Sequence, residues 1–272
     1  ESLRSFKDDE LTKRIADPKG YEPDLTFFLQ RYLPTLDKPV CFDVGANIGI
    51  HTIQLARFSE HVFSFEPVPF IFKVLIENIK TNNFKNIHAY NYALSDQVCE
   101  KNIYVNMDGN FGGSSIEDRN PRSKELKIRL VKGDYFMREN KVKNVDFIKI
   151  DVEGHESKVC RGFQEIIHEQ SPIIALEWNS IQTKDDFESH NLFKTLFENY
   201  LTLPLIDNHL DFRYRSRNEL KFKAFRKLLR PLYNLIHTKK IIIGKFYKRE
   251  NYGNLLLVPK GKVNEILSIF RF

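Results

Sequence analysis

Short apolar runs alternate along this chain with stretches in which apolar residues recur at helical spacing. The runs with strand character occupy residues 39–42, 62–65, 87–94, 145–150 and 173–177. Two stretches with helical spacing lie between them, at residues 49–58 and 70–80. Apolar strands separated by helices are typical of a parallel sheet that is covered on both faces. The alternation therefore predicts an α/β fold.

The flanks of this pattern predict the domain organisation. Residues 24–33 have helical character, so we expect residues 1–36 to form a helical lead-in. Residues 37–272 are expected to form the main domain. In this domain a late strand at residues 255–258 is expected to pair with residues 201–206.

The positive charge of the chain is concentrated in one segment. Residues 211–250 carry 13 Lys or Arg and three acidic residues, within a predicted insertion at about 207–252. The apolar residues from 219 to 237 have helical spacing, which predicts a basic helical insertion. Three interpretations stay open: a solvated helix face, a membrane-surface contact through residues 219–249, or a surface for an anionic partner. No aromatic platform or groove motif supports nucleic acid as that partner, although it stays an alternative.

The cysteines and the hydropathy indicate a reducing compartment. Cys41, Cys99 and Cys160 are scattered and form no CxxC pair, which argues against a disulfide framework or a zinc site. No apolar run approaches the ~18 residues of a membrane span. We therefore expect a cytoplasmic protein, either free or peripherally bound to a membrane.

A turn with two glycines follows the first predicted strand. The spacing is G-x-x-x-G, with Asp43 two residues before Gly45, and differs from the G-x-G-x-x-G of dinucleotide-binding turns. An acid at this position disfavours a pyrophosphate and favours a cationic ligand, such as one with a sulfonium and an α-amino group. Glu66 ends the second strand, where a carboxylate can accept from two vicinal hydroxyls. The candidate ligand-binding residues here are Asp43, Gly45, Ala46, Asn47, Gly49, Glu66 and Pro67.

Ser95 and Asp96 follow the third predicted strand and are further candidates. The end of this strand is expected beside the end of the second one, where Asp96 could accept from the amino group of an adenine. An Asx turn at a strand end is the alternative interpretation.

The densest group of ionisable residues follows the strand at 145–150. The candidate catalytic residues are Lys149, Asp151, Glu153, His155 and Glu177, and Asp151 is also a candidate for cofactor binding. Because the carboxyl ends of neighbouring parallel strands meet at one edge of a sheet, the acids are expected to converge in one cleft. They suit a general base that takes a proton from a hydroxyl, or a divalent cation. We favour the base and expect no metal, because no further ligands are evident.

Residues 102–130 are the least regular part of the main domain. This stretch contains Gly112, Gly113, Ser114 and Ser115. It is expected to be a surface connection or a loop that closes over a substrate.

Together these motifs resemble the FkbM family of methyltransferases. The resemblance rests on residues 21–22, 43–49, 65–67, 93–96, 112–115, 146–156 and 176–177. Its most specific part is the run K-I-D-V-E-G-x-E at residues 149–156. It spans roughly residues 20–180 and ends before the basic segment.

The resemblance implies a Rossmann-like class I methyltransferase fold, with a seven-stranded, mostly parallel sheet and helices on both faces. It also implies S-adenosylmethionine as the methyl donor. The implied reaction is O-methylation of a hydroxyl on a carbohydrate, glycolipid or natural product. Two alternatives stay open. One is an RNA methyltransferase that uses the basic segment, and the other is a non-catalytic S-adenosylmethionine-binding protein.

Overall fold

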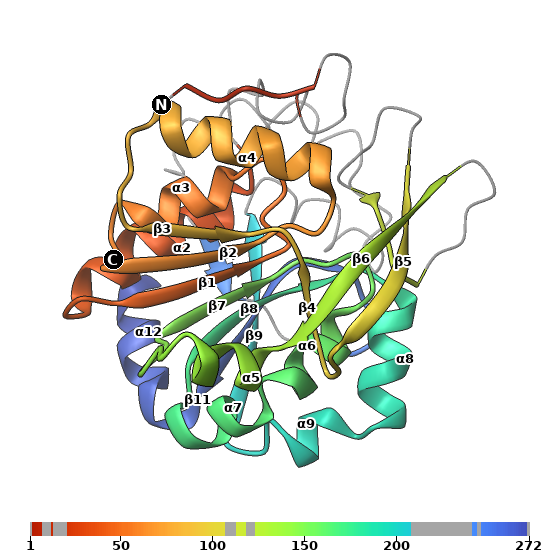
Figure 1. Cartoon of the computed structure of the whole chain (residues 1–272). Coiled ribbons are helices and arrows are strands. Elements are labelled where there is room, and N and C mark those ends of the chain that lie inside the picture. The colour runs from red at the N-terminus through yellow and green to blue at the C-terminus, as the bar shows by residue number, and fades with distance from the viewer. Residues whose placement is uncertain are drawn as a thin grey trace, which may run out of the picture.

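The computed structural model describes residues 2–6, 12, 21–106, 113–117, 123–207, 241–243 and 246–270 (Figure 1). Its main sheet has the strand order β10-β9-β11-β8-β7-β1-β2-β3. The strands are β1 (Val40–Val44), β2 (His61–Phe65), β3 (Ile87–Tyr90), β7 (Phe147–Ile150), β8 (Ile173–Trp178), β9 (Tyr200–Asp207), β10 (Ile241–Ile243) and β11 (Tyr252–Pro259). The pairs joining β3, β2, β1, β7 and β8 are parallel, and β11 lies antiparallel between β8 and β9.

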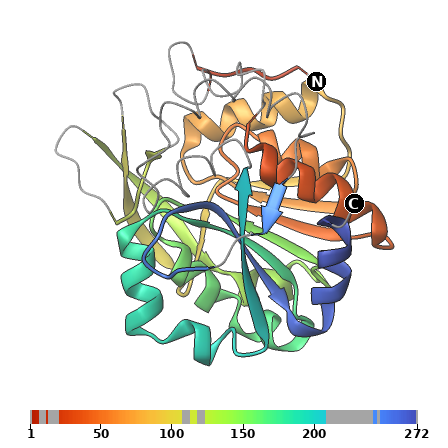
Figure 2. The same ribbon diagram turned by 180° about the vertical axis from the view of Figure 1, so that it is seen from behind.

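Helices cover both faces of this sheet (Figures 1 and 2). On one face lie α2 (Pro23–Tyr32), α3 (Ile50–Ala56), α4 (Pro69–Thr81) and α12 (Val263–Phe270). On the other lie α5 (Gly133–Glu139), α6 (Glu156–Gly162), α7 (Gln164–Gln170), α8 (Ile181–Ser189) and α9 (Leu192–Thr195). Two short 3₁₀ helices, η1 (Leu33–Thr35) and η5 (Lys260–Lys262), lie next to α2 and α12 in the sequence. Because both faces are covered, all five residues of β1 are buried.

A second, three-stranded sheet lies beside the first, in the order β4-β6-β5. Its strands are β4 (Ala93–Ser95), β5 (Cys99–Val105) and β6 (Lys124–Lys132). Figure 1 shows β5 and β6 extending away from the main sheet. The single strand expected at residues 87–94 is thus two strands, and much of the stretch expected to be irregular is paired. Alternating buried residues such as Ile128 and Leu130 carry this pairing.

The predicted fold class is confirmed. The main sheet contains the seven expected strands, which lie in the spatial order β3, β2, β1, β7, β8, β11, β9, with helices on both faces. β10 adds a short antiparallel strand beside β9. The late strand pairs with residues 200–205 within the β11–β9 ladder, as expected. The basic segment lies largely outside the described residues, including all of residues 208–240. Within the described part of the chain, no helix is long and apolar enough to cross a membrane.

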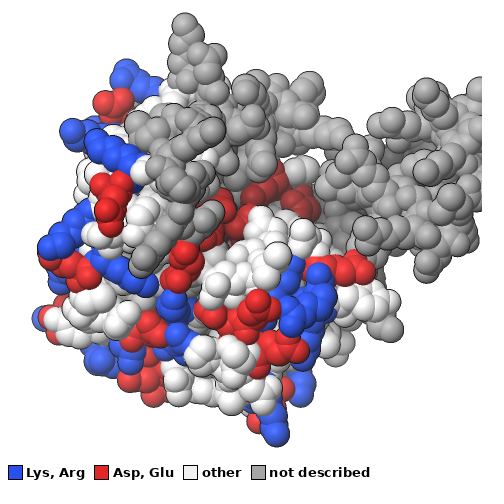
Figure 3. All heavy atoms as spheres, turned by 90° about the vertical axis from the view of Figure 1, so that its right-hand side faces the viewer, with Lys and Arg blue, Asp and Glu red and all other residues white. Residues whose placement is uncertain are grey.

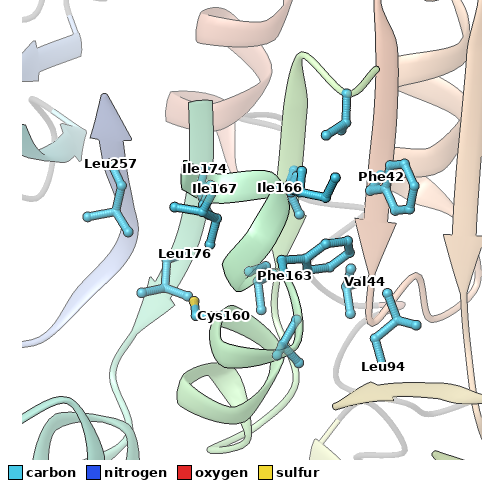
Figure 4. Packing of buried hydrophobic residues seen from close by; sticks show 14 of the residues in the cluster. Phe42, Val44, Leu94, Cys160, Phe163, Ile166, Ile167, Ile174, Leu176 and Leu257 are labelled. Atoms are coloured by element: carbon cyan, nitrogen blue, oxygen red, sulfur yellow. The ribbon is translucent and has the colours of Figure 1, made fainter. Parts of the chain in front are cut away.

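Phe42 of β1 lies at the centre of the core between the main sheet and helices α5, α6 and α7 (Figure 4). Its ring centroid lies 5.7 Å from that of Phe65 in a stacked arrangement. Phe163 and Phe136 contact it edge-on, at 5.6 and 5.8 Å. Aromatic pairs in these geometries add to the free energy of burial. Phe42 therefore joins the centre of the sheet to α5 and to the residue that follows α6.

We predict that Phe42→Ala lowers the free energy of unfolding by about 3–5 kcal/mol, because it leaves a large cavity between rings that cannot close it. Urea unfolding followed by circular dichroism measures the change. Val98→Ala is the control, since Val98 is 54% exposed and its loss should change stability by less than about 0.5 kcal/mol. Equal effects of the two substitutions would contradict this account of the core.

Candidate active site

The turn between β1 and α3 is shaped by contact with β7. Gly45 has a φ of 83°, and a Cβ atom there would lie 1.8 Å from the backbone oxygen of Asp151. Gly49 has a φ of 95°, and its Cβ would lie 2.6 Å from Leu75 Cδ1. Only glycine combines this backbone conformation with such contacts. The missing side chain at Gly45 makes room for the Asp151 carbonyl, and at Gly49 it makes room for the Leu75 side chain.

A cavity of about 280 Å³ opens at the carboxyl ends of these strands. The predicted site residues that line it are Gly45, Ala46, Asn47, Glu66, Pro67, Ser114, Lys149, Asp151, Glu153, His155 and Glu177. Those that do not line it are Asp43, Gly49, Ser95, Asp96, Gly113 and Ser115. Gly112 lies outside the described residues. The structure thus brings the glycine turn and the acids to one cavity, as expected for the switch region of an α/β sheet.

Glu66 is a buried carboxyl group in the wall of this cavity. Its Oε2 accepts from the backbone N–H of Asn47 at 3.0 Å, and its Oε1 accepts from that of Val68 at 2.8 Å. Burial raises the pKa of Glu66 to about 7, and the charge of Asp43 acts in the same direction. The two N–H donors oppose the shift. The carboxyl group is therefore fixed in place and titrates near neutral pH.

Lys149 is a buried cation between two acids. Its Nζ lies 3.1 Å from Asp151 Oδ2 and 3.8 Å from Asp43 Oδ1. Burial alone would lower the pKa of Lys149, but the charges of Asp151, Asp43 and Glu22 outweigh it and raise the pKa. Asp43 is fully buried and also accepts from Thr52 Oγ1 at 2.6 Å. The structure therefore places Asp43 outside the cavity lining, where it neutralises Lys149.

Three carboxylates converge at the acidic part of the cavity. One oxygen from each of Asp151, Glu153 and Glu177 lies within 4.8 Å of the others. Burial raises the pKa of Glu177 to about 11, with the charges of Asp151 and Glu153 adding to the shift. Glu177 therefore holds a proton at neutral pH, while its Oε1 accepts from Asn179 Nδ2 at 2.6 Å. Oxygens at this spacing can serve proton transfer, and they are also donors that a divalent cation accepts.

Acidic side chains gather in the middle of one face of the molecule, where the surface is hollowed (Figure 3). Among the described residues that line the cavity, the acids are Glu66, Asp151, Glu153 and Glu177, and the one Lys or Arg is Lys149. Because Lys149 is matched by Asp43 and Asp151, the cavity favours a cationic ligand over an anionic one. The preference expected from Asp43 alone is thus carried by other acids.

His155 is not placed as a free general base. It is 1% exposed, its Nε2 lies 2.9 Å from Ser95 Oγ, and its Nδ1 lies 2.7 Å from Glu117 Oε1. Burial lowers the pKa of His155, so the ring is neutral at neutral pH. Because both ring nitrogens have partners, the ring links Ser95 at the end of β4 to Glu117.

Asp96 also has a partner that the sequence did not reveal. Its Oδ2 accepts from Arg161 Nε at 3.0 Å and from Arg161 Nη2 at 2.6 Å. Neither Asp96 nor Ser95 reaches the cavity, so the expected contact with an adenine amino group has no geometric support. The nearby cavity wall is apolar and includes Ala93, Leu94, Ile103 and Ile116.

Residues 43–214 match the family model of the methyltransferase FkbM domain. The chain belongs to this family. The matched segment confirms the predicted family, the enzyme class and S-adenosylmethionine as the cofactor.

Relatives of this FkbM protein share limited parts of its length. A hexuronic acid methyltransferase, AglP, of Haloferax volcanii is 25% identical over 172 residues, which cover 63% of this chain and 68% of that protein. Methyltransferase 1 of Beauveria bassiana is 26% identical over 152 residues, covering 48% of this chain and 61% of that protein. The crystal structure of an FkbM methyltransferase from Methylobacillus flagellatus has a TM-score of 0.45 and 18% identity, covering 65% of this chain and 44% of that one.

The FkbM cavity is also lined by residues that the sequence analysis did not assign to the site. Tyr21 and His51 line it, and His51 Nε2 lies 2.8 Å from Glu22 Oε2. Burial would raise the pKa of Glu22, but His51 and Lys149 lower it to about 2. His51 lies in the first turn of α3, directly after the glycine turn, and this position was the available signal. Tyr21 and Glu22 belong to the stretch that carries the family resemblance, but the sequence does not reveal their place at the cavity. The side chain of Glu22 reaches it through contacts with His51 and Asn254, which lie 29 and 232 residues away.

We predict that Gly45→Ala lowers the free energy of unfolding by about 3 kcal/mol or more, because its Cβ meets a backbone oxygen and its positive φ is strained. The matched control is Gly253→Ala, where a Cβ atom meets nothing within 4 Å. Thermal and urea unfolding compare the two variants. A Gly45→Ala protein as stable as the Gly253→Ala protein would show that β1 and β7 do not meet in this way.

Proposed function

We propose that this FkbM protein transfers the methyl group of S-adenosylmethionine to a hydroxyl group of a carbohydrate, glycolipid or natural-product acceptor. The observation that carries the proposal is the convergence of Asp151, Glu153 and Glu177 within 4.8 Å in the cavity that Glu66 also lines. A hydroxyl is weakly acidic, so a base at the reacting oxygen assists its attack.

The residues present fit the cofactor. Glu66 is held by two backbone donors and keeps lone pairs for the ribose hydroxyls. The apolar wall around Ile103 and Ile116 suits a purine ring, and the nearby acids suit a cationic sulfur and an amino group. When bound, the cofactor supplies a sulfonium methyl that is already activated for displacement. The protein then contributes mainly orientation and exclusion of water.

Asp151 is the proposed general base. Lys149 orients its carboxylate through the 3.1 Å ion pair, and Glu153 and Glu177 complete the acidic surroundings. Because Glu177 is protonated at neutral pH, it can donate a hydrogen bond while Asp151 takes the proton of the acceptor hydroxyl. His155 is assigned a positioning role, since both of its ring nitrogens are occupied.

The relatives and the charge of the cavity support a carbohydrate over RNA. The relative from Haloferax volcanii is named for methylation of a hexuronic acid. Among the described lining residues the acids outnumber the one Lys or Arg, and their negative charge disfavours a phosphate backbone. RNA methylation through the basic segment is therefore an outcome of the test.

The deciding experiment is transfer of labelled methyl groups to a cell lysate, which is then separated into glycan, lipid, RNA and protein. Label in the glycan or lipid-linked fraction supports the proposal. Label in RNA supports the RNA methyltransferase. Binding of the cofactor without transfer to any fraction leaves the non-catalytic binding protein.

We predict that Asp151→Asn lowers the rate of methyl transfer by about 100-fold or more, because the amide cannot accept the hydroxyl proton. Binding of S-adenosylhomocysteine, measured by calorimetry, should change by less than about tenfold. Asp37→Asn, at an exposed position before β1, is the control with normal rate. A fully active Asp151→Asn protein would reject Asp151 as the base.

We predict that the affinity for the cofactor decreases as the pH is lowered below about 7. The pKa of Glu66 is raised from its ordinary value of 4.5 to about 7, so the unliganded folded protein keeps this proton up to about pH 7. The unfolded chain loses the proton near pH 4.5, so the contribution of Glu66 to the stability of the fold falls as pH rises between these two values. Ribose hydroxyls donate to the ionised form, so affinity for S-adenosylhomocysteine should be about tenfold weaker at pH 6 than at pH 8.

Glu66→Gln should bind weakly at both pH values, because an amide has one acceptor oxygen in place of two. The control is Glu60→Gln, at an exposed position before β2. Its affinity for S-adenosylhomocysteine should depend on pH as that of the unmodified protein does. Equal affinity of the unmodified protein at pH 6 and pH 8 would contradict the role of Glu66.

A further inference from the structure

Residues 113–117 are hydrogen-bonded to the loop between β7 and α6. This loop, residues 151–155, carries Asp151 and Glu153 and is called the acid loop. Ser115 Oγ donates to the backbone oxygen of Glu153 at 2.7 Å and accepts from the N–H of Glu117 at 3.1 Å. Ser115 also exchanges two backbone hydrogen bonds with Tyr104 of β5, at 2.9 and 3.1 Å. Segment 113–117 therefore joins the second sheet to the end of β7.

Glu117 makes the second attachment. Its Oε1 accepts from His155 Nδ1 at 2.7 Å and from Lys158 Nζ at 2.5 Å. An ionised carboxylate only accepts, so the His155 proton is on Nδ1, and Nε2 accepts from Ser95 Oγ at 2.9 Å. The neutral ring thereby links three segments: the end of β4, segment 113–117 and the start of α6.

The order of Ser95, His155 and Glu117 resembles a hydrolase triad, but burial excludes that chemistry. Ser95 is fully buried and does not line the cavity. A nucleophile must reach its substrate. The array is therefore suited to fixing positions and not to nucleophilic attack.

The acid loop needs such fixing because its backbone is strained. Glu153 has a φ of 51° and Gly154 a φ of 99°. A non-glycine residue keeps a left-handed conformation only where neighbouring contacts impose it. One of these contacts is the Ser115 hydrogen bond to the Glu153 carbonyl, and Glu156 adds two more by accepting from the N–H groups of Val152 and Gly154.

We propose that Glu117 is a positioning residue for methyl transfer. By holding His155 and Lys158, it keeps Glu153 in its strained conformation and keeps Ile116 in the cavity wall. Ile116 lies between the two anchored residues Ser115 and Glu117, and it is 8% exposed. Loss of Glu117 should therefore disturb the acid loop and the cofactor wall together. This inference rests on the proposed function, because it assigns Glu153 to the reacting end of the cavity.

The test compares Glu117→Ala with Glu117→Gln. In the glutamine variant an amide oxygen can still accept from His155 Nδ1–H, whereas alanine removes the acceptor. Glu100→Ala is the matched control, because Glu100 lies on β5 with a side chain that is 65% exposed and paired with Lys127. Three quantities are measured: kcat with the labelled acceptor fraction, the Kd of S-adenosylhomocysteine, and hydrogen exchange of the amides of residues 152–158.

We expect Glu117→Ala to lower kcat by about 10- to 100-fold, as small misplacements of reacting groups do. It should also weaken S-adenosylhomocysteine binding by about fivefold and speed amide exchange in residues 152–158. Glu117→Gln should recover most of kcat and of the exchange protection. The Tm of both variants should stay close to that of the Glu100→Ala control.

Normal kcat and normal exchange in Glu117→Ala would overturn the proposal. So would equal losses in both variants together with a lower Tm, since that pattern marks a residue that only stabilises the fold. If the unmodified protein neither binds S-adenosylhomocysteine nor transfers methyl groups, the proposed function fails. The exchange comparison then still decides whether Glu117 holds the loop.

Discussion

The buried ammonium group of Lys149 is the interaction on which the site depends. A charge inside a protein requires partners, and removing one of them from a buried pair is strongly destabilising. Lys149 of β7 is in register with Asp43 of β1, and Asp151 lies two residues after Lys149, directly beyond the end of β7. A shift of β7 by one residue would separate these charges and turn the side chains to the opposite face. The charge cluster therefore favours one register for the centre of the sheet.

This register also brings together two sets of groups that serve different ligands. Gly45 lets the turn after β1 touch the carbonyl of Asp151, so the Glu66 wall and the acids share one cavity. In the proposed reaction, the distance between the methyl donor and the acceptor is thus set by the pairing of β1 with β7 and of β7 with β8. Rigid strands hold reacting groups more closely than mobile loops do.

The sequence predicted the features that depend on local pattern and on strand direction. Alternating apolar runs identified the central strands, and the rule that parallel strands end at one edge brought Asp151 near Glu177. It could not show that Arg161 neutralises Asp96, because this pair spans 65 residues. The sequence also did not reveal the pairing of β5 with β6 or the hydrogen bond between His155 and Glu117. Each of these depends on which side chains meet after the chain has folded.

The left-handed backbone at Glu153 has a consequence for engineering this enzyme. Glycine or asparagine adopts that conformation with less strain, so either residue would raise the stability of the isolated turn. Either residue would also remove a carboxylate from the cavity. In the proposed reaction, selection for heat resistance alone would therefore remove a carboxylate from the reacting end of the cavity. Stability and the proposed activity then make opposing demands on this one residue.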